Sequence, residues 1–224
     1  ILPKKNDFSQ AGYSFGSRVF KLQKNYRNSR EILTLAREIL WNSIDDAFID
    51  ESSIDLLEPD FANRTGDLPV IMEAESLEAE LAGAKEYCQN YISKVDSSAN
   101  CCIILSGYSK LEVASFGTIA GIPTLDTKGN FSDELITLSD METVKGLEFD
   151  VVFIVNCNAQ NLPPQTHAKE EHFRDGCRLY VAMTRAKHRL ILSYSGEISP
   201  WLEQLHEAYE YENAEVFFDL DNLQ

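Results

Sequence analysis

The sequence predicts an α/β domain with a mostly parallel β-sheet. Short apolar runs alternate with longer helical stretches, which is typical of strands joined by crossover helices. The run at 151–155 is the strongest strand signal, and the run at 101–105 shows no polar alternation. A strand without polar alternation is buried on both faces, as the inner strands of parallel sheets are.

The first part of the chain predicts a strand, a helix and an irregular stretch. The strand is expected at 19–22 and the helix at 29–41, where Ser29 is suited to cap the N-terminus. Apolar residues with helical spacing predict the buried face of that helix: Ile32, Leu33, Leu35, Ala36, Ile39 and Leu40. The acidic stretch at 45–69 has no regular period, so we expect an irregular surface segment there.

The middle of the chain continues the alternation. A strand at 69–72 is expected to lead into a long amphipathic helix at 77–95, ahead of the buried strand. A further helix is predicted at 110–120 and ends at Gly121, because glycine adopts the left-handed conformation common at helix C-termini.

The last part predicts the rest of the sheet. A short strand is expected at 135–138, a helix at 170–186 and a final core strand at 189–194. The tail from Trp201 is expected to hold one more helix. Its apolar cluster at 216–218 could be core, a docking strand or a partner site, and core is the simplest explanation.

The chain is acidic, with 20 basic and 36 acidic residues and a formal net charge of −16. Affinity for a phosphate backbone comes mostly from lysine and arginine, so this balance argues against a free-standing nucleic-acid-binding module. It is compatible with a domain that touches nucleic acid through a few local groups. No apolar run is long enough to cross a bilayer and no secretion signal opens the chain, so we expect a cytoplasmic protein. The start at Ile1 rather than Met indicates a piece of a longer protein.

The cysteines and histidines show no metal-ligand spacing, so we expect no metal site. The adjacent cysteines at 101–102 lie inside the run predicted as a buried strand. Reduced thiols, mostly in the core, are therefore expected: Cys88, Cys101, Cys102, Cys157 and Cys177.

Three segments carry polar residues at the ends of predicted elements. They are Gln23-Lys24-Asn25-Tyr26-Arg27, Lys145-Gly146-Leu147-Glu148-Phe149 and Tyr180-Val181-Ala182-Met183-Thr184-Arg185-Ala186. Each has a plain structural explanation, such as a surface cation, a turn glycine or a cation near a helix C-terminus. Together they place two arginines, an aromatic ring and an acid at element ends of one sheet, and ligands of such sheets gather at strand ends.

In this order the three segments resemble the fourth, fifth and sixth motifs of UvrD/Rep-type superfamily 1 DNA helicases. The stretch at 101–123 also resembles the strand, helix and Gly-Ile-Pro turn of that family, so the similarity extends over most of 22–195. The resemblance implies the C-terminal, second RecA-like motor domain, a three-layer αβα domain of the P-loop-NTPase type. No Gly-x-x-x-x-Gly-Lys-Ser/Thr occurs, so the phosphate-binding loop itself is lacking in this chain.

In this family ATP with Mg²⁺ is held between two RecA-like domains. The resemblance therefore implies a partner, the N-terminal RecA-like domain of the same protein, which would bind most of the ATP and its Mg²⁺. Arg27 and Arg185 would act as arginine fingers on the γ-phosphate, since their forked donors and fixed charge suit a phosphoryl group. This chain alone would not hydrolyse ATP.

The remaining nucleotide contacts are also implied by the resemblance. Tyr26 would stack on the adenine ring, and Glu148 would accept hydrogen bonds from the ribose hydroxyls. Gly146 would let the backbone come close to the nucleotide, because glycine has no side chain. Gln23 is implied as a further contact.

Two positions depart from the family pattern. Relatives usually carry a threonine and a histidine that help to hold single-stranded DNA, where this chain has Asp140 and Glu142. Two acids facing a phosphate backbone would be unfavourable. Either this contact is lost, or Glu142 points to solvent and Thr143 or Lys145 contacts the strand.

These inferences predict one domain over 1–224, with an irregular connection at 1–18 and a C-terminal extension at 196–224. Only 124–139 separates the Gly-Ile-Pro turn from the fifth motif, so we expect a compact domain without the large extra subdomain of many relatives. The favoured function is the motor half of a DNA helicase or translocase, with RNA left open. The alternative is a degenerate helicase-like module that binds other proteins, which the acidity of the chain favours.

Overall fold

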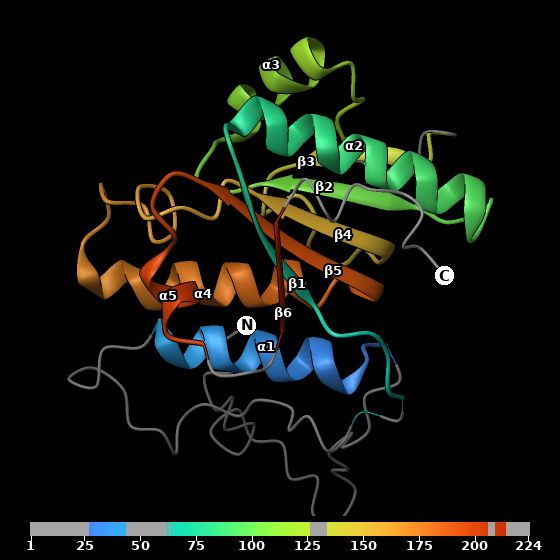
Figure 1. Cartoon of the computed structure of the whole chain (residues 1–224). Helices are drawn as coiled ribbons and strands as arrows, with labels where there is room; N and C mark the ends of the chain where they lie inside the picture. Colours follow the sequence, from blue (N-terminus) through green and yellow to red (C-terminus); the bar gives the residue numbers. More distant parts are fainter. Residues whose placement is uncertain (1–26, 44–61, 63, 126–133, 206–208, 214–224) are drawn as a thin grey trace, which may run out of the picture.

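The computed structural model describes residues 27–43, 62, 64–125, 134–205 and 209–213. The described elements run in the order α1 (Arg30–Asn42), β1 (Val70–Ala74), α2 (Leu77–Lys94), β2 (Cys101–Leu105), α3 (Lys110–Ala120), β3 (Ile136–Ser139), β4 (Phe149–Val155), α4 (Lys169–Met183), β5 (Ala186–Ser195), α5 (Pro200–Glu203) and β6 (Glu210–Asn213). The alternation of helices and strands predicted from the sequence is confirmed (Figure 1).

The six described strands form one sheet in the order β3-β2-β4-β5-β1-β6, and every neighbouring pair is parallel. The predicted mostly parallel sheet is therefore confirmed. In the centre, β2 pairs with β4 so that Ile103 lies opposite Phe153. Next to it, Phe149 at the start of β4 lies opposite Ala186 at the start of β5. The amino ends of β4 and β5 are thus neighbours at one edge of the sheet.

Helices cover both faces of the sheet, which gives the predicted three layers. Helices α2 and α3 lie on one face, and α1 and α4 lie on the other (Figure 1). Successive residues of β2 alternate between the two cores, with Ile103 on the α2 side and Ile104 on the α4 side. This strand is buried along its whole length, because each of its residues packs into one core or the other.

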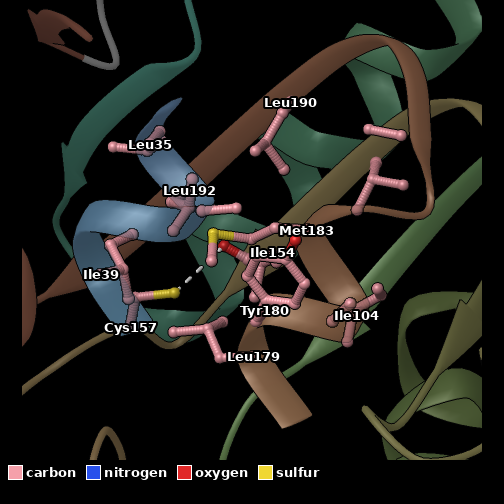
Figure 2. Close-up of a cluster of buried hydrophobic side chains, with 14 of the residues drawn as sticks. Leu35, Ile39, Ile104, Ile154, Cys157, Leu179, Tyr180, Met183, Leu190 and Leu192 are labelled. Atoms are coloured by element: carbon pink, nitrogen blue, oxygen red, sulfur yellow. Dashed lines mark hydrogen bonds between the residues drawn. The ribbon is translucent and has the colours of Figure 1, made fainter. Parts of the chain in front are cut away.

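The core beneath α1 and α4 is built mainly from aliphatic side chains, with aromatic and sulfur-containing ones such as Tyr180 and Met183 among them (Figure 2). Helix α1 contributes Leu35 and Ile39, helix α4 contributes Leu179 and Met183, and the central strands supply the floor. Full burial of one such side chain contributes about 1.5–3 kcal/mol. This core packs α1, α4 and the central strands against one another, so it fixes where each of these elements ends at the edge of the sheet.

The helix boundaries follow from capping. The hydroxyl of Ser29 accepts a hydrogen bond from the backbone N–H of Ile32, as predicted for the start of α1. All six apolar residues predicted for the inner face of α1 are buried. At the end of α3, Gly121 adopts φ 61°, the left-handed conformation predicted there.

A buried acid joins α2 to the carboxyl ends of two strands. One carboxylate oxygen of Glu80 accepts the backbone N–H of Asn156 at 2.7 Å and the hydroxyl of Ser193 at 2.6 Å. Its other oxygen accepts the hydroxyl of Ser195 at 2.8 Å. Burial raises the pKa of Glu80, and these three hydrogen bonds oppose the rise. Glu80 therefore fastens α2 to the ends of β4 and β5.

One predicted boundary was wrong, and one strand was not predicted. The helix predicted at 170–186 ends at Met183, because the chain beyond it pairs with β4: the N–H of Phe149 donates to the carbonyl of Arg185 at 2.9 Å. Strand β6 was not predicted, since its polar sequence has no strand period. It forms because its backbone extends the sheet beyond β1. The strand predicted at 19–22 and the cluster at 216–218 lie outside the described residues.

All five cysteines are unpaired in the structure. Four of them are buried, and Cys177 is half-buried. Within the described part of the chain, no helix combines the length and apolar character needed to span a membrane.

Candidate functional site

Arg27 and Glu148 form an ion pair at one edge of the sheet. The Nε of Arg27 lies 2.6 Å from Oε1 of Glu148, and each side chain is 41% exposed. Arg27 stands just ahead of the residue that caps α1, and Glu148 stands just ahead of β4. Residues from two of the three predicted motifs, far apart in the sequence, therefore meet here.

Arg185, which belongs to the third motif, lies at the same edge of the sheet. It lies between the end of α4 and the start of β5, and only 8% of the residue is exposed. Its Nε donates to the carbonyl of Val181 at 3.0 Å, and one terminal nitrogen donates to the carbonyl of Leu147 at 3.2 Å. These two bonds hold the guanidinium against the turn that carries Glu148.

Arg185, Arg27 and Glu148 interact electrostatically. The pKa of Arg185 is lowered, mainly because burial disfavours its charge and further because the positive charge of Arg27 lies near it. The carboxylate of Glu148 acts in the opposite direction and raises that pKa. The arrangement therefore presents two guanidinium groups and one acid at a single edge, a set suited to an anionic ligand with hydroxyl groups.

Asn28 joins the two segments that carry the arginines, and sequence analysis gave it no role. Its buried side-chain amide donates to the carbonyl of Thr184 at 2.9 Å and to the carbonyl of Ala186 at 2.7 Å. These two carbonyls flank Arg185 in the chain. The only local signal was its position beside Arg27, since its partners are more than 150 residues away in the sequence.

Gly146 shapes the turn before β4. It adopts φ 88°, and the N–H of Leu147 donates to the carbonyl of Val144 at 3.1 Å. A side chain at position 146 would find no atom within 4 Å, so the backbone conformation rather than crowding requires glycine here. Gly146 is exposed at the surface beside Glu148. The two other predicted nucleotide contacts, Gln23 and Tyr26, lie outside the described residues.

This arrangement lies at the amino ends of β4 and β5. Ligands of open parallel sheets usually bind outside the carboxyl ends of the strands. The Arg27, Glu148 and Arg185 cluster, called the amino-edge cluster below, therefore departs from that rule.

The acids at 140 and 142 have separate structural roles. The carboxylate of Asp140 is buried and accepts the N–H groups of Glu142 and Thr143 at 2.8 and 2.9 Å. Its second oxygen accepts the hydroxyl of Thr143 at 2.6 Å. Asp140 therefore organises the turn after β3. Glu142 is 67% exposed, and it pairs with Arg178 of α4 at 2.7 Å.

Of the two residues predicted to contact nucleic acid, Lys145 is exposed and Thr143 is half-buried. The hydroxyl of Thr143 is engaged by Asp140, whereas Lys145 lines a small surface pocket with Arg174 and Arg178. The basic groups of this region therefore lie on α4 and on the turn that follows β3.

A larger pocket lies at the carboxyl ends of β2, β3 and β4, on the opposite edge of the sheet from the amino-edge cluster. It has a volume of about 590 Å³ and is lined by the segments that follow these strands and by Asp175 and Arg178 in the middle of α4. In its wall, Asp175 lies 2.7 Å from Nδ1 of His167 and 2.8 Å from Arg178. We call this space the carboxyl-edge pocket.

The predicted cofactor, ATP, would be bound together with Mg²⁺. Among the described residues, no group of three or more histidine, cysteine, aspartate or glutamate side chains is arranged to hold a metal ion. The described residues therefore do not form a metal site by themselves.

Comparison with known proteins gives a consistent result. Residues 109–197 match the UvrD-like helicase C-terminal domain. The crystal structure of the C-terminal domain of a possible DNA helicase from Lactobacillus plantarum WCFS1 has the same fold, with a TM-score of 0.60 and 22% sequence identity. That match covers 84% of this chain and 98% of the other. The resemblance recognised from the motifs is confirmed.

Proposed function

We propose that this chain supplies the second motor domain of an ATP-dependent superfamily 1 DNA helicase or translocase, because residues 109–197 match the UvrD-like helicase C-terminal domain. The whole of 1–224 would be that one domain, with 1–18 as the connection from an N-terminal RecA-like domain and 196–224 as an extension. The ATP site would be shared between the two domains, so this chain alone would be inactive.

The observation that carries the proposal is the meeting of Arg27, Glu148 and Arg185 at one edge of the sheet. Two arginines are the groups that stabilise a phosphoryl group as its oxygens gain charge, and such fingers contribute about 10³–10⁵ in rate. Arg185 is held by two backbone carbonyls and is preorganised for this role. Arg27 is half-exposed and can move toward a phosphate when a second domain closes on the edge.

The remaining nucleotide contacts are proposed around the same edge. Glu148 would accept hydrogen bonds from the ribose hydroxyls, and the exposed turn at Gly146 would allow close approach. Tyr26, which directly precedes Arg27, would stack on the adenine ring, and Gln23 would be a further contact. The N-terminal domain would supply the phosphate-binding loop and the Mg²⁺ ligands.

Single-stranded DNA is proposed to contact the turn after β3, through Lys145 and Thr143. Lys145 is exposed and has the basic residues of α4 beside it, which suits a phosphate backbone. The carboxylate of Asp140 is buried and held by three hydrogen bonds within its own turn, which keeps it from contacting the strand directly. The strongly negative net charge implies that the other domain supplies most of the positive field.

The decisive experiment measures ATP hydrolysis, with and without single-stranded DNA, by a protein that contains this chain and its N-terminal domain. The isolated chain is assayed beside it. Activity stimulated by DNA in the longer protein, together with none in the isolated chain, is the expected result. A folded longer protein without ATPase activity would contradict the motor function and favour a helicase-like interaction module.

A further inference from the structure

Asn28 connects the backbones of the two proposed arginine fingers. It directly follows Arg27 in the chain, and only 2% of the residue is exposed. Its side-chain amide donates to the carbonyls on both sides of Arg185, at 2.9 and 2.7 Å. One residue is therefore joined to Arg27 by the covalent chain and to the segment of Arg185 by two hydrogen bonds. The spacing between the two segments is set at this point.

The two hydrogen bonds fill an open side of β5. The backbone N–H of Phe149 donates to the carbonyl of Arg185 at 2.9 Å, so this carbonyl faces β4. Neighbouring carbonyls of a strand point to opposite sides, so the carbonyl of Ala186 faces away from β4. On that side of the described sheet, β1 pairs with β5 only from Ile191 onward. Asn28 therefore takes the place of a neighbouring strand beside the start of β5.

Apolar packing alone does not fix the position of Asn28. Leu35 and Ile39 of α1 share one core with Leu179 and Met183 of α4 (Figure 2). Contact between apolar side chains has no preferred direction, whereas a hydrogen bond weakens steeply when its angle departs from linearity. Asn28 thus supplies the directional contact at the amino end of α1, which is the end that carries Arg27.

The two fingers differ in how firmly their side chains are held. The guanidinium of Arg185 donates to the carbonyls of Val181 and Leu147 and is mostly buried. The side chain of Arg27 is 41% exposed, so its reach depends on where its backbone stands. A shift of the segment at Asn28 would move the base of the Arg27 side chain relative to the fixed Arg185. Misplacement of a reacting or stabilising group by about 1 Å can cost about 100-fold in rate.

We propose that Asn28 is a positioning residue for ATP hydrolysis, whose buried amide holds Arg27 and Arg185 as one unit so that both guanidinium groups meet the same γ-phosphate. The inference rests on the proposed motor function. Asn28 itself would touch neither the nucleotide nor the attacking water. It would act only through the two arginines that it holds in register.

The test uses the longer protein with both motor domains. The kcat for ATP hydrolysis and the Kd of a fluorescent, non-hydrolysable ATP analogue are measured for Asn28→Ala. The matched control is Asn42→Ala, because the side-chain amide of Asn42 donates to the carbonyl of Trp201 at 3.0 Å at the opposite end of the same helix. Thermal unfolding of each variant gives an assay temperature at which both proteins are folded.

Asn28→Ala should lower kcat by about 10- to 100-fold while the Kd of the analogue changes by less than about twofold. The reason is that the fingers are misaligned for the transition state, whereas the N-terminal domain still binds most of the nucleotide. Asn42→Ala should lower the unfolding temperature and keep kcat within about twofold of the unsubstituted value. A residue with a structural role alone would lower the unfolding temperature without lowering kcat in the folded protein.

A double-mutant cycle shows whether Asn28 acts through Arg185. In a protein that already carries Arg185→Lys, adding Asn28→Ala should lower the single-turnover rate by less than about threefold, because the group that Asn28 positions is already impaired. Independent effects would instead multiply. If Asn28→Ala does not fold, Asn28→Ser is measured against the same criteria, since its one hydroxyl proton can serve only one of the two carbonyls.

Two results would overturn the inference and leave the motor function intact. One is an ATPase-active protein in which the folded Asn28 variant keeps a normal kcat. The other is a cycle in which the losses from Asn28 and Arg185 multiply in full. A folded, unsubstituted two-domain protein that hydrolyses no ATP would instead contradict the motor function, and the positioning role would fall with it.

Discussion

The Nε of Arg27 lies 2.6 Å from Oε1 of Glu148. The residue proposed to bind the γ-phosphate is therefore paired with the residue proposed to bind the ribose. Both side chains are about half-exposed, and an exposed ion pair contributes only about 0–1 kcal/mol. The pair can therefore open at little cost. Opening would separate Glu148 from Arg27 and leave its carboxylate able to meet a ribose.

Glu148→Gln should reduce discrimination between ATP and 2′-deoxy-ATP in the two-domain protein. A hydrogen bond to a charged group contributes about 1.5–3 kcal/mol, so the KM for ATP should rise by about tenfold or more. The KM for 2′-deoxy-ATP should rise less, because it has fewer ribose hydroxyls to lose. Steady-state hydrolysis of both nucleotides measures this. An equal rise for both nucleotides would remove the ribose role from Glu148.

Arg185→Lys should lower kcat by about a thousandfold with little change in nucleotide affinity. Lysine keeps the charge but lacks the forked donors that reach the Val181 and Leu147 carbonyls and a phosphate together. Single-turnover hydrolysis and equilibrium binding of an ATP analogue separate the two quantities. Near-normal turnover in a folded variant would exclude Arg185 as an arginine finger.

Asn28→Asp should destabilise the isolated chain more than Asn28→Ala. Alanine leaves the carbonyls of Thr184 and Ala186 without their donor, at a cost of about 1–3 kcal/mol. Aspartate places a carboxylate against the same two carbonyl oxygens in a buried position, which adds repulsion. Urea unfolding of the three proteins gives the order. If the aspartate variant were as stable as the native chain, these two bonds would not be what joins α1 to the start of β5.

Gly146→Ala and Gly196→Ala form a matched pair. Both glycines have positive φ, 88° and 79°, and neither would bring a new side chain within 4 Å of another atom. Each alanine should therefore cost a similar amount of stability, about 1–2 kcal/mol. Only Gly146→Ala should also weaken binding of an ATP analogue, because Gly196 lies at the opposite end of the sheet. Equal effects on binding would leave Gly146 with a conformational role only.

Glu80→Gln should alter how stability depends on pH. The folded-state pKa of Glu80 is raised above its ordinary value of 4.5, so the folded state binds this proton more tightly than the unfolded state does. Its contribution to stability is thus greatest below the ordinary value and is lost as pH rises through the raised one. The unfolding free energy of the native chain minus that of the variant should fall as pH rises above 4.5. A difference that stays constant across urea titrations at several pH values would contradict this.

The parts of the fold with a local period were predictable. Helices α1, α2 and α3 were expected because their apolar spacing and caps lie within each segment. Strand β6 was not, because its polar sequence becomes a strand only through pairing with β1. The end of α4 was also misplaced, since pairing between the chain at Arg185 and β4 decides it.

The residues of the candidate site also separate into those that the sequence predicted and those that it did not. The motif resemblance pointed to Arg27, Glu148 and Arg185, and the structure brings these three together. The bonds of Asn28 and the pair between Glu142 and Arg178 join positions far apart in the chain, and no local pattern marks such partners. Residue types that suit a function were therefore visible in the sequence, whereas the side chains that hold them required the fold.

The short outer strands of the sheet have a consequence for solubility. In the described sheet the outermost strands, β3 and β6, have four residues each, whereas the long strands β4 and β5 lie inside. A long unpaired strand edge is a template on which another chain can assemble, and short edge strands limit that hazard. At the β6 edge the hydroxyl of Tyr211 also contacts Tyr194 and Glu73, which ties this strand to the sheet. Within the described residues, the sheet therefore offers only short strand edges for pairing with another chain.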